Sequence, residues 1–185
     1  MSVLLPITCP TDCTSSLPPV DFNECAPEVH YGEISHLYIA TADATCFTNV
    51  EQITEWTTRV SESEMTANAI RDLVVMADLG EPEQTEQPIS GDRTVVGFKS
   101  FTINIDVDET NDINYRFLMN LECNTKYKLW FETADGLLYG GNCGIEGTLR
   151  LNNIIPRDRT EIAKFSGTFK WKSQFSPYRS LSPLS

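Results

Sequence analysis

The side chains that could support catalysis are few in this sequence. Its two histidines are His30 and His36, and a Ser/His/Asp or Cys/His mechanism would need one of them as the base. No Gly-x-Ser-x-Gly segment is present to form a nucleophile elbow. His36 lies between Ser35 and Leu37 in a segment with strand character, which favours a surface or interface histidine. We therefore expect no catalytic residue and no enzymatic activity.

The cysteines allow more than one interpretation. Cys9, Cys13 and Cys25 are close together, and three thiolates can bind zinc, but a structural site needs a fourth ligand. Cys143 or His30 could supply that ligand only if the fold brought it near. An even count of six cysteines suits a disulfide framework in a small secreted protein. We expect free or packed thiols, and leave open whether the first three bind metal or form disulfides.

Two further motifs match ligand sites only in part. Asp106, Asp108 and Asn111 do not complete a calcium loop, because Thr110 and Asn111 stand where an EF-hand needs a ligand and a glycine. A strand that runs into a capped helix explains them better. The glycines of 140–144 lack the Lys-Ser/Thr of a phosphate-binding loop, and predict a hairpin turn. We expect no cofactor and no metal.

Composition and charge limit the partners. The chain has 185 residues and 41% hydrophobic residues, which suits one globular domain. Its net charge of −12 argues against binding to nucleic acid through phosphate contacts and against docking on an anionic membrane. The net charge is −9 over 1–70, −7 over 71–122 and +4 over 123–185. This asymmetry suits head-to-tail or ring association of copies, or alternatively a solvated acidic face that maintains solubility.

The start of the chain does not predict secretion. No segment has the apolar length that spans a bilayer. Residues 1–10 lack a basic region, and Pro6 interrupts their short apolar stretch, so they do not resemble a signal peptide. We expect synthesis and assembly in a reducing cytoplasm.

Three regions follow from the distribution of proline. Residues 1–32 contain five of the ten prolines and predict an extended N-terminal arm that straps onto another subunit through Phe22 and Tyr31. Residues 33–172 form a single β-rich domain, and 173–185 a peripheral tail. Within the domain, 80–91 is polar, acidic and interrupted by Pro and Gly, which predicts a long loop exposed to water or to a basic partner.

The elements of the domain are mostly strands. Residues 101–107 alternate apolar and polar side chains, and 34–39, 55–61, 70–77, 127–132, 137–139, 148–155 and 160–171 also suit strands or parts of them. One helix is predicted over about 111–121, capped by Thr110 and seated on the sheet by Ile113, Phe117, Leu118 and Leu121. Seven or so strands predict an antiparallel β-barrel or sandwich with one flanking helix.

Several segments in order resemble structural tail proteins of phages that infect Bacteroidetes, including the ring proteins of the crAss-like phage tail barrel. They are Gly91-Asp-Arg93, the strand to Val107, Asp108-Glu-Thr-Asn-Asp-Ile-Asn-Tyr-Arg-Phe-Leu118, Tyr127-Lys-Leu-Trp-Phe-Glu-Thr133, Gly136-Leu-Leu-Tyr-Gly-Gly141, Ile155-Pro-Arg-Asp-Arg159 and Phe165-Ser-Gly-Thr-Phe-Lys-Trp171. The resemblance covers most of 30–172. It implies a tail-tube-like β-barrel that assembles as a ring of six or twelve copies in the virion.

This resemblance implies a conduit for the genome and for ejected proteins, with neighbouring tail or connector proteins as partners and DNA only as non-specific cargo. No membrane partner is expected. An acidic lumen would repel phosphates, and the loop at 80–91 would lie there or clasp a neighbour through the basic residues of 123–185. Two alternatives remain: a carbohydrate-binding β-sandwich that uses Trp56, Trp130 and Trp171, and a small hydrolase that uses paired carboxylates.

Overall fold

The computed structural model describes residues 20, 25–26, 29–30, 32–61, 63–91 and 93–184. The predicted N-terminal arm at 1–32, with Cys9, Cys13, Phe22 and Tyr31, therefore lies largely outside the described residues. Its strap contact and the state of its thiols stay predictions.

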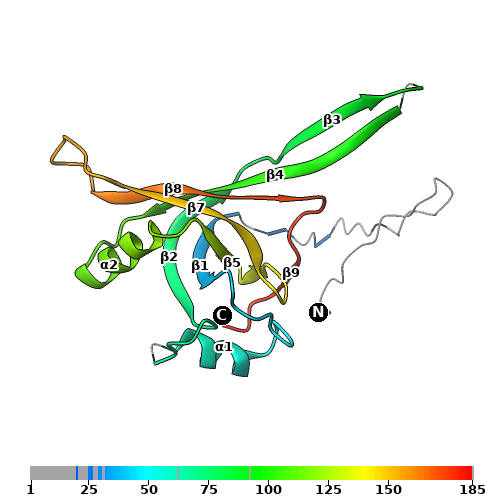
Figure 1. The fold of residues 1–185 in the computed structure, drawn as a ribbon. Coiled ribbons are helices and arrows are strands. Elements are labelled where there is room, and N and C mark those ends of the chain that lie inside the picture. The colour runs from blue at the N-terminus through cyan, green and yellow to red at the C-terminus, as the bar shows by residue number, and fades with distance from the viewer. Residues whose placement is uncertain are drawn as a thin grey trace.

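Six antiparallel strands close into a barrel, so the architecture is one of the two predicted (Figure 1). The strands follow the order β1-β2-β4-β8-β7-β5, and pairing of β1 with β5 closes the ring. Closure removes the open edges that a sandwich would retain. The barrel strands are β1 (Ile34–Thr41), β2 (Ile70–Leu79), β4 (Arg93–Val107), β5 (Lys126–Thr133), β7 (Ile145–Ile154) and β8 (Lys164–Ser173).

Five further elements attach to the barrel. Strand β3 (Glu83–Ile89) pairs with β4, whereas β6 (Leu137–Tyr139) pairs with β5 and with β9 (Arg179–Leu181). Helix α1 (Ile53–Val60) lies near one end of β2, and helix α2 (Asp112–Leu121) lies beside β7. Figure 1 shows the β3–β4 hairpin projecting far from the barrel, away from α2.

The barrel interior is filled by the apolar side chains of the period-two pattern. Phe101, Ile103, Ile105 and Val107 of β4 are all buried, and Ile103 is opposite Phe169 of β8. Because successive side chains of a strand point to opposite faces, the intervening polar residues of β4 lie on the outer wall. The alternation at 101–107 therefore determined which face of β4 points inward.

Strand β5 is buried on both faces, and this requires a second layer outside the barrel. Trp130 points outward into a cluster with Trp56, Phe47, Tyr38 and Val50. Trp56 was expected in a strand at 55–61, but it belongs to helix α1. Trp56 and Val60 are four residues apart, so they share one face of a helix. In a strand, two residues separated by an even number of positions also share one face. The spacing alone could not separate the two.

Helix α2 forms as predicted, but its cap and its packed face differ. Asn111, not Thr110, is the N-cap, because its side-chain oxygen accepts hydrogen bonds from the N–H groups of Ile113 and Asn114 at 3.1 and 2.9 Å. Leu118 and Leu121 are buried and Phe117 is partly buried against the core. Ile113 is 81% exposed.

The error at Ile113 has a geometric cause. Tyr115 packs edge-on against Phe165, with ring centroids 5.4 Å apart. The packed face of α2 therefore runs through Tyr115, Leu118 and Leu121, which are three residues apart, and it is rotated away from Ile113.

The acidic segment at 80–91 is not a loop. Residues 83–89 form β3, which pairs with β4 from Glu83 opposite Ser100 to Ile89 opposite Arg93. Pro88 is compatible with this position because β3 is an edge strand, where an N–H on the open side makes no ladder bond. The turn follows at Ser90 and Gly91, and the φ of +82° at Gly91 is one that glycine adopts readily.

The C-terminal tail is also more integrated than predicted. Strand β9 pairs with β6, and Ser182 is buried. Pairing with β6 gives the tail backbone partners that its own sequence does not reveal.

Strand β8 begins later than predicted. Its first residue is Lys164 rather than residue 160, so Ile162 lies outside the strand and is exposed.

Candidate functional site

Both histidines pair with aspartates on the surface. His36 Nδ1 lies 2.9 Å from Asp72 Oδ1 across the β1–β2 pair, and His30 Nδ1 lies 3.0 Å from Asp135 Oδ2. The side chains of His36 and Asp72 are about one third exposed. Neither pair borders the groove described below. His36 therefore lies at the surface, as its sequence context predicted.

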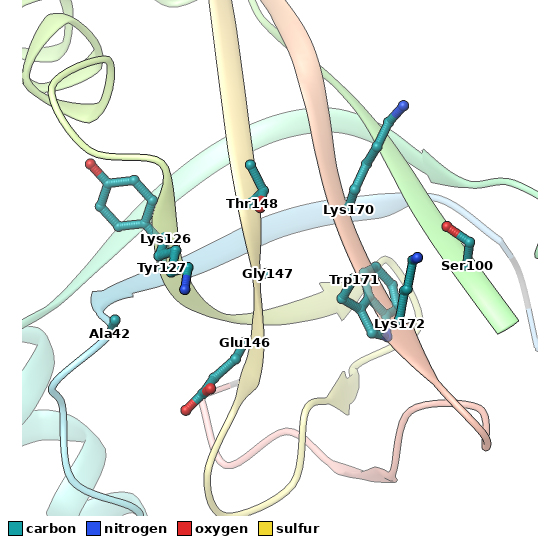
Figure 2. A pocket seen from close by; sticks show the side chains of 10 residues that line it. All are labelled: Ala42, Ser100, Lys126, Tyr127, Glu146, Gly147, Thr148, Lys170, Trp171 and Lys172. Carbon is teal, nitrogen blue, oxygen red and sulfur yellow. The ribbon is translucent and has the colours of Figure 1, made fainter. Parts of the chain in front are cut away.

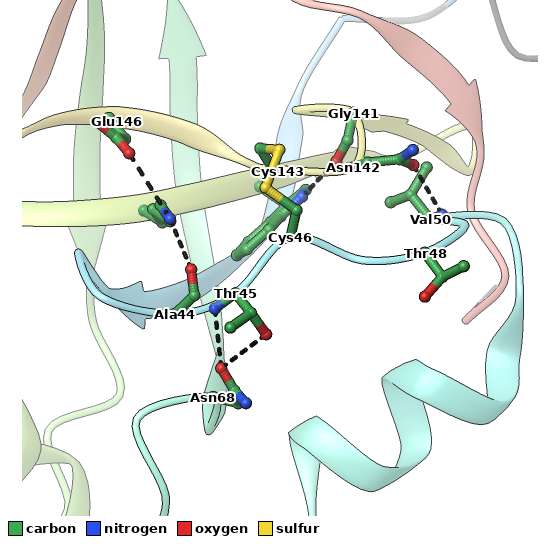
Figure 3. Close-up of a disulfide and its surroundings, with 12 residues drawn as sticks. Ala44, Thr45, Cys46, Thr48, Val50, Asn68, Gly141, Asn142, Cys143 and Glu146 are labelled. Atoms are coloured by element: carbon green, nitrogen blue, oxygen red, sulfur yellow. Dashed lines mark hydrogen bonds and ion pairs between the residues drawn. A yellow bond between two sulfur atoms is a disulfide. The ribbon is translucent and has the colours of Figure 1, made fainter.

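Two cysteines form a disulfide, and the expectation of free or packed thiols was wrong for this pair. Cys46 and Cys143 are joined although they are 97 residues apart in the sequence (Figure 3). The loop after β1 is held against the β6–β7 turn beside the bond, because Phe47 N–H donates to Asn142 O at 2.7 Å and Val50 N–H to Asn142 Oδ1 at 3.0 Å. Only the even count of cysteines hinted at this pairing.

Arg59 anchors the same loop from the helix side. Its guanidinium donates to the backbone oxygens of Thr45 and Cys46 at 2.6 and 3.1 Å and lies 4.1 Å from the centroid of the Phe47 ring. The side chain also pairs with Glu55, one turn earlier in α1, and the residue is only 8% exposed. The single cation of residues 1–70 is thus structural and is not available to a partner.

All three tryptophans are buried, and one of them, Trp171, borders the groove described below. Trp56 and Trp130 are fully buried, and their indole N–H groups donate to Val50 O at 2.7 Å and to Gly141 O at 2.8 Å. Trp171 is 7% exposed and stacks on Phe101. All three residues contribute to the buried clusters, and carbohydrate binding through them stays a prediction.

Two of the three residues of the partial calcium motif, Asp106 and Asn111, are already engaged in the fold. Asp106 accepts a hydrogen bond from Lys164 Nζ at 2.7 Å, and this bond lowers the pKa of Asp106 below its ordinary value. Asn111 caps α2. In the part of the chain that the structure describes, no group of three or more His, Cys, Asp or Glu side chains is placed to hold a metal ion.

The most unusual surface feature is the projecting hairpin, which we call the β-arm and define as β3 together with residues 93–98 of β4. Every residue of β3 is exposed. In the described chain β3 pairs only with β4, and β4 begins to pair with β8 only at Lys99, so both edges of the β-arm carry unpaired backbone groups. Phe98 at the base of the β-arm is 59% exposed.

A second feature lies on the outer wall of the barrel next to the β-arm. Lys126 on β5, Arg150 on β7, and Lys170 and Lys172 on β8 are exposed, and we call these four residues the basic face. Thr148 is opposite both Lys126 and Lys170, so the register puts these two lysines in one row. The three lysines border an open groove of about 660 Å³ together with Glu146, Thr148, Ser100 and Trp171. Figure 2 shows how these side chains lie.

The cations of this face have no carboxylate partner within 4 Å among the described residues. Glu146 lies in the same region, but it is 3.6 Å from Nζ of Lys128, which is buried and donates to Ala44 O at 2.6 Å. Neighbouring like charges on a sheet repel one another. The basic face is therefore suited to an anionic partner, and such a cluster is unexpected in a chain with a net charge of −12.

Sequence reasoning located the charges of this surface but not their arrangement. The excess of cations in 123–185 was visible, whereas their gathering on one outer wall depends on strand register. No helix in the described ranges is long and apolar enough to cross a membrane. Comparison of the sequence with known proteins gives no match, either to a protein-family model or to a curated protein.

Proposed function

We propose that this chain is a structural protein of a phage virion, a subunit that forms a ring of six or twelve copies in the tail. The ring would serve as part of the conduit for the genome and for ejected proteins. It would contact neighbouring tail or connector proteins, and DNA would pass only as non-specific cargo. The protein would catalyse no reaction.

The β-arm is the observation that carries this proposal. Within the described ranges it is a two-stranded ribbon whose two edges are unpaired, and β3 is entirely exposed. An isolated two-stranded ribbon is marginally stable in water, and an open edge is a template for pairing with another chain. A partner that covers the β-arm would remove both liabilities, and in an oligomer every subunit would supply one.

The closed barrel and the charge distribution support the same function. A barrel presents a continuous wall without edges, so contacts between copies can be restricted to the features that project from it. The separation of negative charge in 1–122 from positive charge in 123–185 favours contacts between unlike surfaces of two copies. The remaining excess of negative charge would repel DNA from a channel wall.

The mass and shape of the purified full-length protein test the proposal. Light scattering coupled to size-exclusion chromatography should give six or twelve times the mass of one chain, 20.8 kDa. Electron micrographs of that fraction should show closed rings with a central opening. A protein that stays monomeric from micromolar to near-millimolar concentration, at low and moderate salt, would contradict the proposal.

A further inference from the structure

We propose that the β-arm of one copy lies across the basic face of the next copy, where Glu83 and Glu86 of the β-arm, together with Glu81 just before it, pair with the cations of that face. This inference rests on the proposed assembly and names the surface that receives the β-arm. The occupant is a second copy of this chain.

Charge complementarity is the first support. The three glutamates are exposed and lie within six residues on and just before β3, with no cation between Arg71 and Arg93. The receiving surface offers Lys126, Arg150, Lys170 and Lys172, which have no carboxylate partner in the described part of the chain. Each surface is unfavourable by itself because its like charges are close, and each would neutralise the other.

The dimensions of the two surfaces also agree. The seven residues of β3 extend over about 23 Å at the usual rise per residue. The basic face covers β5, β7 and β8, three adjacent strands that span about 10 Å from the first to the third. The β-arm is therefore long enough to cross the whole face, and the groove between the lysines provides space for its side chains.

Among the described residues, no ion pair joins the β-arm to the basic face of its own subunit. Glu83 is opposite Ser100, and Ser100 is opposite Lys172, so Glu83 and Lys172 lie in one row on the same side of the sheet. Two strand spacings separate their backbones by about 10 Å, and a third strand lies between them. The β-arm moreover projects away from the barrel and not over it (Figure 1).

Contact between two different surfaces of identical chains is heterologous. Repeating such a contact produces a closed ring when the rotation closes, and a filament when it does not. The proposed contact therefore has the symmetry that a ring requires, whereas contact between two β-arms or between two basic faces would stop at a dimer.

Reciprocal charge reversal in the full-length protein tests the contact. Lys170→Glu with Lys172→Glu, and Glu83→Lys with Glu86→Lys, should each raise the apparent dissociation constant of the assembly by roughly 100-fold. The four substitutions combined in one chain should restore most of the assembly. Matched controls with the same change of charge are Arg157→Glu with Arg159→Glu, and Glu122→Lys with Glu161→Lys, all at exposed positions outside both surfaces.

Mass by light scattering and thermal unfolding are measured for every variant, so that a loss of assembly is separated from a loss of folding. Restoration by the combined variant, with unaffected controls, supports the contact. The proposed contact is wrong if both double variants lose assembly and the combined variant does not regain it, or if neither double variant loses assembly. In either case the ring proposal stands. A wild-type protein that never assembles defeats the proposed function itself. If the lysine reversal abolishes retention on immobilised heparin but leaves the rings intact, the face serves a polyanion and the inference is wrong.

Discussion

Ser182 donates a hydrogen bond of 2.8 Å to Oε2 of Glu132, and this bond fixes the C-terminal segment to the barrel. Tyr38 donates to the same oxygen at 2.9 Å, and all three residues are buried. Burial, and then the hydrogen bond to Glu132, raise the pKa of Tyr38 above its ordinary range, so the hydroxyl remains a donor at any working pH. The carboxylate thus joins β1, β5 and the chain after β9.

Removing one donor from this buried carboxylate should be costly. We expect Ser182→Ala to lower the free energy of unfolding by about 1–3 kcal/mol, because the acceptor would lose a partner without gaining water. Denaturant titration followed by tryptophan fluorescence provides the measurement. Ser176→Ala, an exposed serine of the same segment, serves as the control and should change little. Equal stability of the two variants would show that the tail is not held by this bond.

The disulfide should stabilise the protein only under oxidising conditions. It closes a loop of nearly one hundred residues, so we expect Cys46→Ser with Cys143→Ser to lower the free energy of unfolding by about 2–4 kcal/mol. Wild-type protein in dithiothreitol should unfold at the same denaturant concentration as this variant. Cys123→Ser, at an exposed free thiol, should behave as wild type in both buffers. If the reductant does not alter wild type, the bond does not form in solution.

Two positions on α2 should respond very differently to truncation. Leu118 is fully buried, so Leu118→Ala should cost about 2–5 kcal/mol of unfolding free energy. Ile113 is largely exposed, so Ile113→Ala should change the stability by less than about 0.5 kcal/mol. Phe117→Ala should fall between them because its ring is partly buried. A large loss at Ile113 in the monomeric fraction would show that the packed face of the helix is a different one.

The pair between Asp106 and Lys164 should add a pH-dependent term to stability. The hydrogen bond from Lys164, and then the bond from Ser166, lower the pKa of Asp106 in the folded state below its ordinary value of 3.8. The stabilisation is therefore present above pH 3.8 and is lost as the pH falls through the folded-state pKa.

Asp106→Asn should consequently be less stable than wild type at neutral pH, and this difference should shrink in acid. Thermal unfolding at pH 7 and at about pH 3 measures it. Asp108→Asn, at the exposed residue two positions on, is the control. A difference that stays constant over this pH range would mean that the carboxylate charge contributes nothing.

The strands with a clear period and the tight turns could be predicted from the order of the residues. Alternation at 101–107 identified the inward face of β4, and Asp135-Gly136 marked the turn between β5 and β6, where Gly136 has a φ of +78°. Helix α2 was recognisable because polar capping residues precede its apolar positions. These features depend on residues close together in the chain, and sequence spacing reports such local geometry directly.

Which distant segments meet could be learned only from the folded chain. Cys46 and Cys143, or Lys126 and Lys170, become neighbours because of which strands pair, and the period within one segment does not reveal which strand lies beside it. The face of α2 that packs depends likewise on where Phe165 and β7 lie. Strand β3 was missed for the converse reason: its stability comes from the ladder with β4, while its own side chains are polar and exposed. The basic face and the β-arm therefore emerged from the fold, although their charges were visible in the sequence from the beginning.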